Sequence, residues 1–236
     1  MLGKRLDDAM VAGMTRIALY DLDRTITRRP TYLPFLLHAA WRLDKKRLLF
    51  LPVLVIVSIG YVFGLVSRAR LKEVNQHLLL GHAIPAARLV EIGESFADKT
   101  LHENIHAQAF ATIAADKAEG RRLAMASASY SFYVVPLARR LGFDDVIATG
   151  SMRGEDGEIL ARIDGENCYS TGKLGLIRAW MEQQQIDPEQ DDIRFYSDSE
   201  SDMPVFEIAH EPVATNPTSK LRKIAEKAGW RVIAWG

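Results

Sequence analysis

Short apolar runs of strand length recur towards both ends of the chain, and the segments between them have the composition of helices. The runs lie at residues 16–21, 122–126, 145–148, 194–196, 213–215 and 230–234. Strands alternating with helices predict a mostly parallel, doubly wound α/β sheet of the Rossmann-like type, because parallel strands need a crossover between them. A turn at 154–157 followed by a run at 158–163 predicts one hairpin arm in addition.

A long segment between the first two runs lacks the strand pattern. From residue 32 to about residue 117, leucine, alanine, arginine and glutamate are frequent, which predicts helices. We therefore divide the chain into an α/β core, residues 1–29 and 118–236, and an inserted α-helical domain, residues 30–117.

The composition is that of an ordinary globular protein, and it narrows the range of partners. The 236 residues are 48% hydrophobic and 25% charged, with a formal net charge of zero. A neutral chain has no overall field that attracts nucleic acid, so we expect no nucleic-acid partner. The single cysteine, Cys168, cannot form an internal disulfide, and residues 1–15 contain no apolar run of signal-peptide length. We therefore expect a cytoplasmic protein.

Two acids end the first apolar run. Asp21 and Asp23 alternate with Leu22, so on an extended backbone both carboxylates lean to the same side. Two anions this close repel each other, which indicates either a metal ion between them or a division of labour between nucleophile and acid. Taken alone, Asp-x-Asp is also common in solvated turns and helix caps.

Three further segments with candidate functional residues follow Asp21 and Asp23 along the chain. Residues 123–127 are an apolar strand ending in Ser127, Lys173 stands at a helix start, and residues 193–202 run from a strand into Asp198-Ser-x-x-x-Asp202. With Asp-x-Asp-x-Thr at 21–25, this order resembles the four motifs of the haloacid dehalogenase superfamily of phosphatases. A helix-rich insert directly after the first motif is similar to the phosphoserine-phosphatase-like branch, subclass IB, in which the insert is a helical cap.

The resemblance implies a Mg²⁺-dependent phosphomonoester hydrolase that acts through an aspartyl-phosphate. Asp21 would be the nucleophile, and Asp23 the general acid and base. Hard oxygen ligands suit Mg²⁺. The implied metal ligands are Asp21, the main-chain carbonyl of Asp23, Asp198 and Asp202, the last directly or through water. The implied phosphate-binding residues are Thr25, Ser127 and Lys173, with Ser129 close enough to compete with Ser127 for this role.

Two positions depart from the family pattern. The residue before the fourth-motif aspartate is Ser197, where the family usually has a glycine, and we expect a cost in loop freedom. Phosphoserine phosphatases also carry a substrate-binding glutamate shortly after the first motif. Residues 26–30 contain Arg28 and Arg29 and no acid. This difference argues against phosphoserine, whose ammonium group would meet cations there.

Residues 48–66 form an uncharged apolar segment with basic clusters on both sides. Its length could just span a bilayer, but a single crossing would separate the first motif from the other three. The segment therefore packs in the protein, lies in the membrane interface, or enters the membrane and returns through bends at Pro52, Gly60 or Gly64. We favour contact of residues 42–72 with an anionic membrane at its inner face, because a small cap has little core in which to bury such a helix.

Several functions stay open at this stage. The apolar segment favours an anionic phospholipid phosphate such as phosphatidylglycerophosphate as substrate. The alternatives are a soluble small-metabolite phosphatase and a membrane-associated interaction protein without turnover, although the intact motif residues argue against the latter. His102-Glu103-x-x-His106 matches a zinc-protease pattern on a helix, but such short patterns recur by chance and no third ligand follows at the near spacing.

Overall fold

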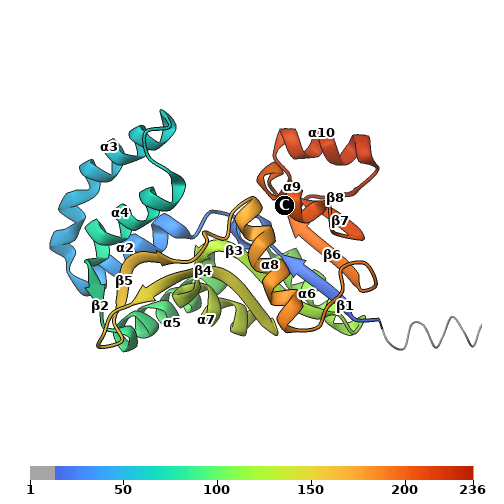
Figure 1. Cartoon of the computed structure of the whole chain (residues 1–236), viewed down its shortest axis with the longest axis horizontal. Coiled ribbons are helices and arrows are strands. Elements are labelled where there is room, and N and C mark those ends of the chain that lie inside the picture. Colours follow the sequence, from blue (N-terminus) through green and yellow to red (C-terminus); the bar gives the residue numbers. More distant parts are fainter. Residues whose placement is uncertain (1–13, 236) are drawn as a thin grey trace, which may run out of the picture.

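The computed structural model describes residues 14–235, and an eight-stranded sheet runs through that part of the chain with the order β2-β5-β4-β3-β1-β6-β7-β8 (Figure 1). The parallel strands are β1 (Arg16–Tyr20), β3 (Arg122–Tyr130), β4 (Asp145–Arg153), β6 (Asp192–Ser197), β7 (Glu211–Thr215) and β8 (Arg231–Ile233). β5 (Ile159–Asp164) returns antiparallel to β4, and β2 (Ala83–Ile84) pairs with β5. The predicted α/β class and the hairpin arm are both confirmed.

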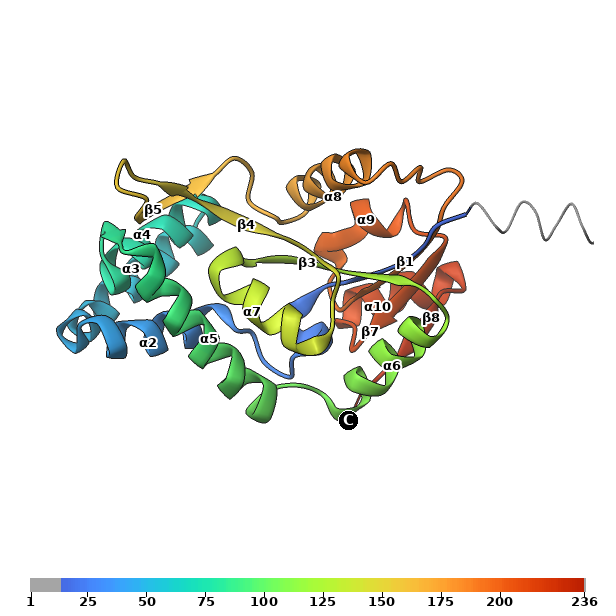
Figure 2. The same cartoon turned by 90° about the horizontal axis from the view of Figure 1, so that it is seen from below.

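Helices cover both faces of the sheet. α5 (Ala86–Glu103), α6 (Ala107–Ala118) and α7 (Ser131–Leu141) lie on one side of the strands (Figure 2). α8 (Thr171–Gln183), α9 (Met203–Phe206) and α10 (Ser219–Ala228) pack on the other. The central strand shows why: Ala18 and Tyr20 enter the first core, whereas Ile17 and Leu19 enter the second. A strand buried on both faces must be apolar throughout, which explains the uninterrupted run in the sequence.

The other helices of the insert gather beside the β4–β5 hairpin at one end of the molecule, far from α10 (Figure 1). They are α2 (Tyr32–Leu43), a 3₁₀ helix (Lys45–Phe50), α3 (Leu51–Val62) and α4 (Arg68–Leu80). Because α5 and α6 pack against the sheet, the insert contributes to both regions. The core–cap boundary at residue 117 stays a prediction.

The apolar segment forms α3, and the cap does not enclose it. In this helix, which the structure describes in full, only Leu54 is buried. The exposed fractions reach 67% at Ile56 and 79% at Val62. No helix within residues 14–235 combines the length and the apolar character needed to cross a bilayer.

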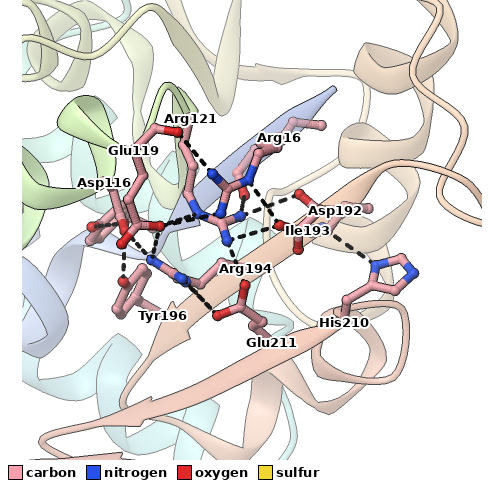
Figure 3. Close-up of polar contacts among 12 residues, drawn as sticks. Arg16, Asp116, Glu119, Arg121, Asp192, Ile193, Arg194, Tyr196, His210 and Glu211 are labelled. Carbon is pink, nitrogen blue, oxygen red and sulfur yellow. Dashed lines mark hydrogen bonds and ion pairs between the residues drawn. The ribbon is translucent and has the colours of Figure 1, made fainter. Parts of the chain in front are cut away.

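Charged residues cluster at the amino ends of the central strands, on the edge of the sheet away from the Asp21 motif (Figure 3). The Arg121 guanidinium is buried and pairs with Asp192 at 2.8 Å and with Glu211 at 2.5 Å. Arg194 pairs with the buried Asp116, which also accepts a hydrogen bond from the Tyr20 hydroxyl. Asp116 thereby ties α6 to β1 and β6, and Arg121 joins the start of β3 to β6 and β7.

We expect Asp116→Ala to lower the free energy of unfolding by about 3–5 kcal/mol, because Arg194 and the Tyr20 hydroxyl would lose their buried partner. Urea denaturation at neutral pH would measure this change. Glu91→Gln breaks the exposed Arg88 pair and serves as the control, with little expected effect. Equal losses in both variants would show that the cluster contributes nothing beyond a surface ion pair.

Candidate active site

Asp21 stands at the carboxyl end of β1, where the chain leaves the sheet. Its amide donates to the Tyr196 carbonyl at 2.9 Å, so the β1–β6 pairing fixes its backbone. A tight turn over Leu22–Ile26 follows, in which Arg24 has a left-handed φ of 64°. In this turn the Thr25 hydroxyl reaches back to Asp21 Oδ2 at 3.2 Å. The turn therefore presents the Asp21 carboxylate above the sheet edge, as the first motif predicts.

Lys173 comes from the first turn of α8 and is almost fully buried. Its Nζ donates to Asp21 Oδ1 at 2.8 Å and to Asp202 Oδ2 at 2.7 Å. Burial alone would lower the pKa of Lys173, but Asp202 and Asp21 outweigh it and raise the pKa above its ordinary value. The residue before it, Gly172, lets the start of α8 pack against the Asn167 main chain, since a Cβ on residue 172 would lie 2.5 Å from the Asn167 carbonyl oxygen. The Lys173 ammonium is thus a fixed cation between Asp21, which follows β1, and Asp202, which follows β6.

Asp23 is held by three hydrogen bonds. Its Oδ1 accepts from the Thr31 amide at 2.7 Å and from the Thr31 hydroxyl at 2.8 Å, and its Oδ2 accepts from the Ser129 hydroxyl at 2.9 Å. Ser127, by contrast, accepts the Ser129 amide at 3.1 Å, which leaves its own hydroxyl proton free to be donated elsewhere. The two serines therefore take different positions: Ser129 supports Asp23, and Ser127 stays the candidate phosphate ligand.

The fourth motif supplies two further acids. Asp202 Oδ2 accepts from Lys173 and from the Ser197 hydroxyl at 2.7 Å, while Asp202 Oδ1 is buried without a partner among the described residues. Ser197 is fully buried, and its φ is not positive. The expected cost of replacing glycine is therefore wrong, because this backbone position does not need glycine and the serine gains a contact to Asp202. Asp198 is also buried beside the site.

The donor set fits a hard divalent cation. Burial raises the pKa of Asp21 to about 6, with Lys173 acting in the opposite direction. Burial, reinforced by Asp21 and Asp202, raises the pKa of Asp198 to about 7. A cation would relieve this repulsion and satisfy the orphaned Asp202 oxygen. Among residues 14–235 no three His, Cys, Asp or Glu side chains alone are arranged to hold an ion, so main-chain oxygen and water would complete the shell, as Mg²⁺ allows.

These groups line a cavity of about 440 Å³ that the cap also borders. Among the described residues that line it, the acids are Asp21, Asp23, Asp198 and Asp202. Arg68, at the start of α4, lies over the Tyr169 ring at 3.9 Å and joins the lining. A larger cavity of about 840 Å³ between α2 and the 3₁₀ helix contains none of the motif residues, so chemistry and not size locates the site.

Lys72, one turn along α4, is buried as well. Its Nζ donates to the Ala128 carbonyl at 2.7 Å and to Asn167 Oδ1 at 2.8 Å, and burial lowers its pKa to about 7. Arg68 and Lys72 belong to the basic cluster after the apolar segment, for which we expected contact with a membrane, and this expectation is wrong for Lys72 because its side chain is buried. Arg68 lines the cavity that contains Asp21. No spacing in the sequence signals either contact, because only the fold of the cap produces them.

Two other sequence-based interpretations also change. Arg28 and Arg29 line a separate cavity beside the end of α5, so they do not meet a substrate at Asp21. The expected repulsion of an ammonium group by these arginines is therefore not supported.

α5 ends at Glu103 and His106 precedes α6, so His102 and His106 do not share one helix face as a zinc protease requires.

The comparisons with known proteins agree with this geometry. Residues 18–207 match the model of the haloacid dehalogenase-like hydrolase family. The chain therefore belongs to this family, and the phosphatases among its relatives make it a hydrolase of the phosphatase type. A histidinol-phosphatase of Neisseria meningitidis is 27% identical over 64% of this chain and 71% of its own length. A probable phosphatase of Mycobacterium tuberculosis is 34% identical, and this chain spans about half (49%) of that relative.

Solved structures show the same fold. A Bordetella pertussis protein of unknown function has a TM-score of 0.81 and 27% identity, covering 93% of this chain and 98% of that one. A phosphoserine phosphatase with bound substrate has a TM-score of 0.61 and 17% identity, covering 93% and 92% of the two chains. The second likeness concerns the fold alone.

Mg²⁺ should bind more tightly as the pH rises from 6 to 8. The raised pKa values mean that Asp198 and Asp21 take up protons as the pH falls through about 7 and then about 6, and only the ionised groups bind the metal. We expect about a tenfold gain in affinity over this range, measurable by titration calorimetry. Asp198→Asn should remove most of the pH dependence, and an affinity independent of pH in the unmodified protein would contradict the assignment.

Proposed function

We propose that this protein hydrolyses phosphomonoesters with Mg²⁺ through an aspartyl-phosphate on Asp21. The observation that carries the proposal is the buried Asp21–Lys173 contact at 2.8 Å, with Asp23 fixed beside the same cavity. A carboxylate nucleophile, a cation for phosphoryl charge and a positioned acid are the three groups that such a reaction needs.

The reaction follows from these positions. A carboxylate oxygen of Asp21 attacks phosphorus and forms the acyl-phosphate bond, while the ester oxygen leaves with the proton that Asp23 donates. Asp23 then takes a proton from water, whose oxygen attacks phosphorus and releases inorganic phosphate and Asp21. Lys173 and the Ser127 hydroxyl would donate to phosphoryl oxygens throughout. Mg²⁺, held by Asp21, Asp198, the Asp23 carbonyl and Asp202, would neutralise phosphoryl charge when bound.

For the substrate, the relatives favour a small phosphate ester. One is called a histidinol-phosphatase and another a phosphoserine phosphatase, and the phosphate esters in both names are small molecules. The cavity of about 440 Å³ has room for a molecule of that size.

A phospholipid phosphate, such as phosphatidylglycerophosphate, is the second candidate, and the exposure of α3 supports it. Large apolar side chains run along the exposed segment, with 80% exposure at Leu49 and 82% at Leu65. The exposed basic residues Lys45, Lys46 and Arg70 would attract an anionic surface, whereas Arg47 is engaged with the His77 and Leu78 carbonyls. On this proposal the cap rests on the inner face of the membrane without crossing it.

Asp21→Asn should reduce the turnover of p-nitrophenyl phosphate at least about a thousandfold, because the amide cannot form the covalent intermediate. Steady-state rates with Mg²⁺ would measure the loss, and a labelled acyl-phosphate should be trapped in the unmodified protein alone. Asp156→Asn makes the same chemical change at an exposed turn and should retain full activity. Turnover by the Asp21 variant near the unmodified rate would exclude Asp21 as nucleophile.

The lipid-surface proposal predicts co-sedimentation with anionic vesicles that weakens at high salt. A Leu49→Asp, Leu65→Asp double variant should lose most of this binding, since it places charges in the exposed apolar segment. Val90→Asp with Phe110→Asp alters two exposed apolar residues on α5 and α6 and is the matched control. If the unmodified protein does not bind anionic vesicles, the proposal that the cap rests on a membrane surface fails.

A further inference from the structure

A second cavity adjoins the catalytic one, and it is apolar. It has a volume of about 590 Å³ and lies among α2, α3 and α4. Its lining includes Leu54, Val55 and Ile59 of α3 and Leu71 of α4. The one hydroxyl that α3 contributes, that of Ser58, donates to the Leu54 carbonyl of the same helix at 2.7 Å. The groove therefore offers apolar surface and little competition from polar groups.

The two cavities share part of their walls. Tyr32 and Leu33, at the start of α2, line both the apolar groove and the cavity that contains Asp21 and Lys173. The Tyr32 hydroxyl donates to the Lys72 carbonyl at 3.1 Å, which fixes this residue against α4. The apolar groove therefore begins at the same two residues that border the cavity containing Asp21.

The floor of the groove holds an unused polar atom. Asn75 is 6% exposed and lines the groove, and its Oδ1 has no hydrogen-bond partner within residues 14–235. Because this oxygen is itself covered by protein atoms, it offers a bound molecule no polar contact, and the surface that the groove presents stays apolar.

We propose that the groove binds the alcohol portion of the substrate, and that this portion is an apolar chain. The inference rests on the proposed phosphatase function and specifies its substrate class: phosphate monoesters of long-chain, amphiphilic alcohols. The phosphate lies at Asp21 and Lys173, the ester oxygen lies near Asp23, and the chain extends past Tyr32 and Leu33 along α3. Burial of successive methylene groups then supplies binding energy that a short ester lacks.

Alkyl phosphates from butyl to decyl, each kept below its micelle concentration, test the proposal without any membrane. For the unmodified protein with Mg²⁺, kcat/KM should rise about two- to fourfold per methylene until the groove is full. Ile59→Asp places a charge in the groove, and it should flatten this rise. Ile56→Asp makes the same change on an exposed part of α3 outside the groove lining and should keep the rise. Each variant is judged by its own ratio of decyl to butyl ester, which cancels differences in the folded fraction.

The outcomes distinguish failure of the phosphatase proposal from failure of the groove proposal. No turnover of any ester, p-nitrophenyl phosphate included, would overturn the phosphatase proposal itself. Turnover with a kcat/KM that is flat across chain length would overturn the groove alone. The groove proposal also fails if both α3 variants lose the rise equally, because general adsorption of the chain to the apolar helix would then explain it.

Discussion

The contact of Lys173 with two buried carboxylates is the interaction on which the candidate site depends. Asp21 follows β1, Asp202 follows β6, and Lys173 begins α8, so one ammonium joins three separate elements. Without it, Asp21 and Asp202 would face each other in a buried environment, where repulsion raises the pKa of a carboxyl group. Burial, together with the neighbouring acids, still raises the pKa of Asp21 and Asp198 against the effect of Lys173, so a further positive charge would favour their ionised forms.

The sequence predicts the sheet and the motif residues well for a physical reason. Strands buried on both faces are uninterrupted apolar runs, and parallel strands bring their carboxyl ends to one edge, so Asp21 and Asp198 had to be neighbours. The support for Asp23 could not be predicted this way. Thr31 and Ser129 reach it from segments 98 residues apart, and neither belongs to a periodic pattern. The two-residue strand β2 likewise has no pattern of its own and exists through its pairing with β5.

The sequence predicts the structure of the cap least well. An uncharged helix can be buried or exposed with the same pattern, and only the volume of the surrounding core decides between them. The cap buries Leu54 and leaves most of α3 in contact with solvent. The basic residues that flank α3 differ in orientation. Lys72 points inward to Ala128 and Asn167, whereas Lys45 is exposed. Charge counted along the sequence therefore overstates the charge available to an external surface.

Helix α4 links these two regions of the molecule. Leu71 borders the apolar groove, and the next residue, Lys72, donates to the main chain of Ala128, immediately after the second motif. Arg68, one turn earlier, lines the cavity that contains Asp21. Helix α4 thus contacts the apolar groove, the loop after the second motif and the cavity beside Asp21, and the buried Lys72 fixes its position. A shift of α4 away from the core would separate Lys72 from Ala128 and Asn167, and the cost of leaving a buried amine without its hydrogen-bond partners opposes that movement. The cap is consequently positioned by the same loops that it helps to enclose, so the shape of the groove and the geometry of the candidate site are set together.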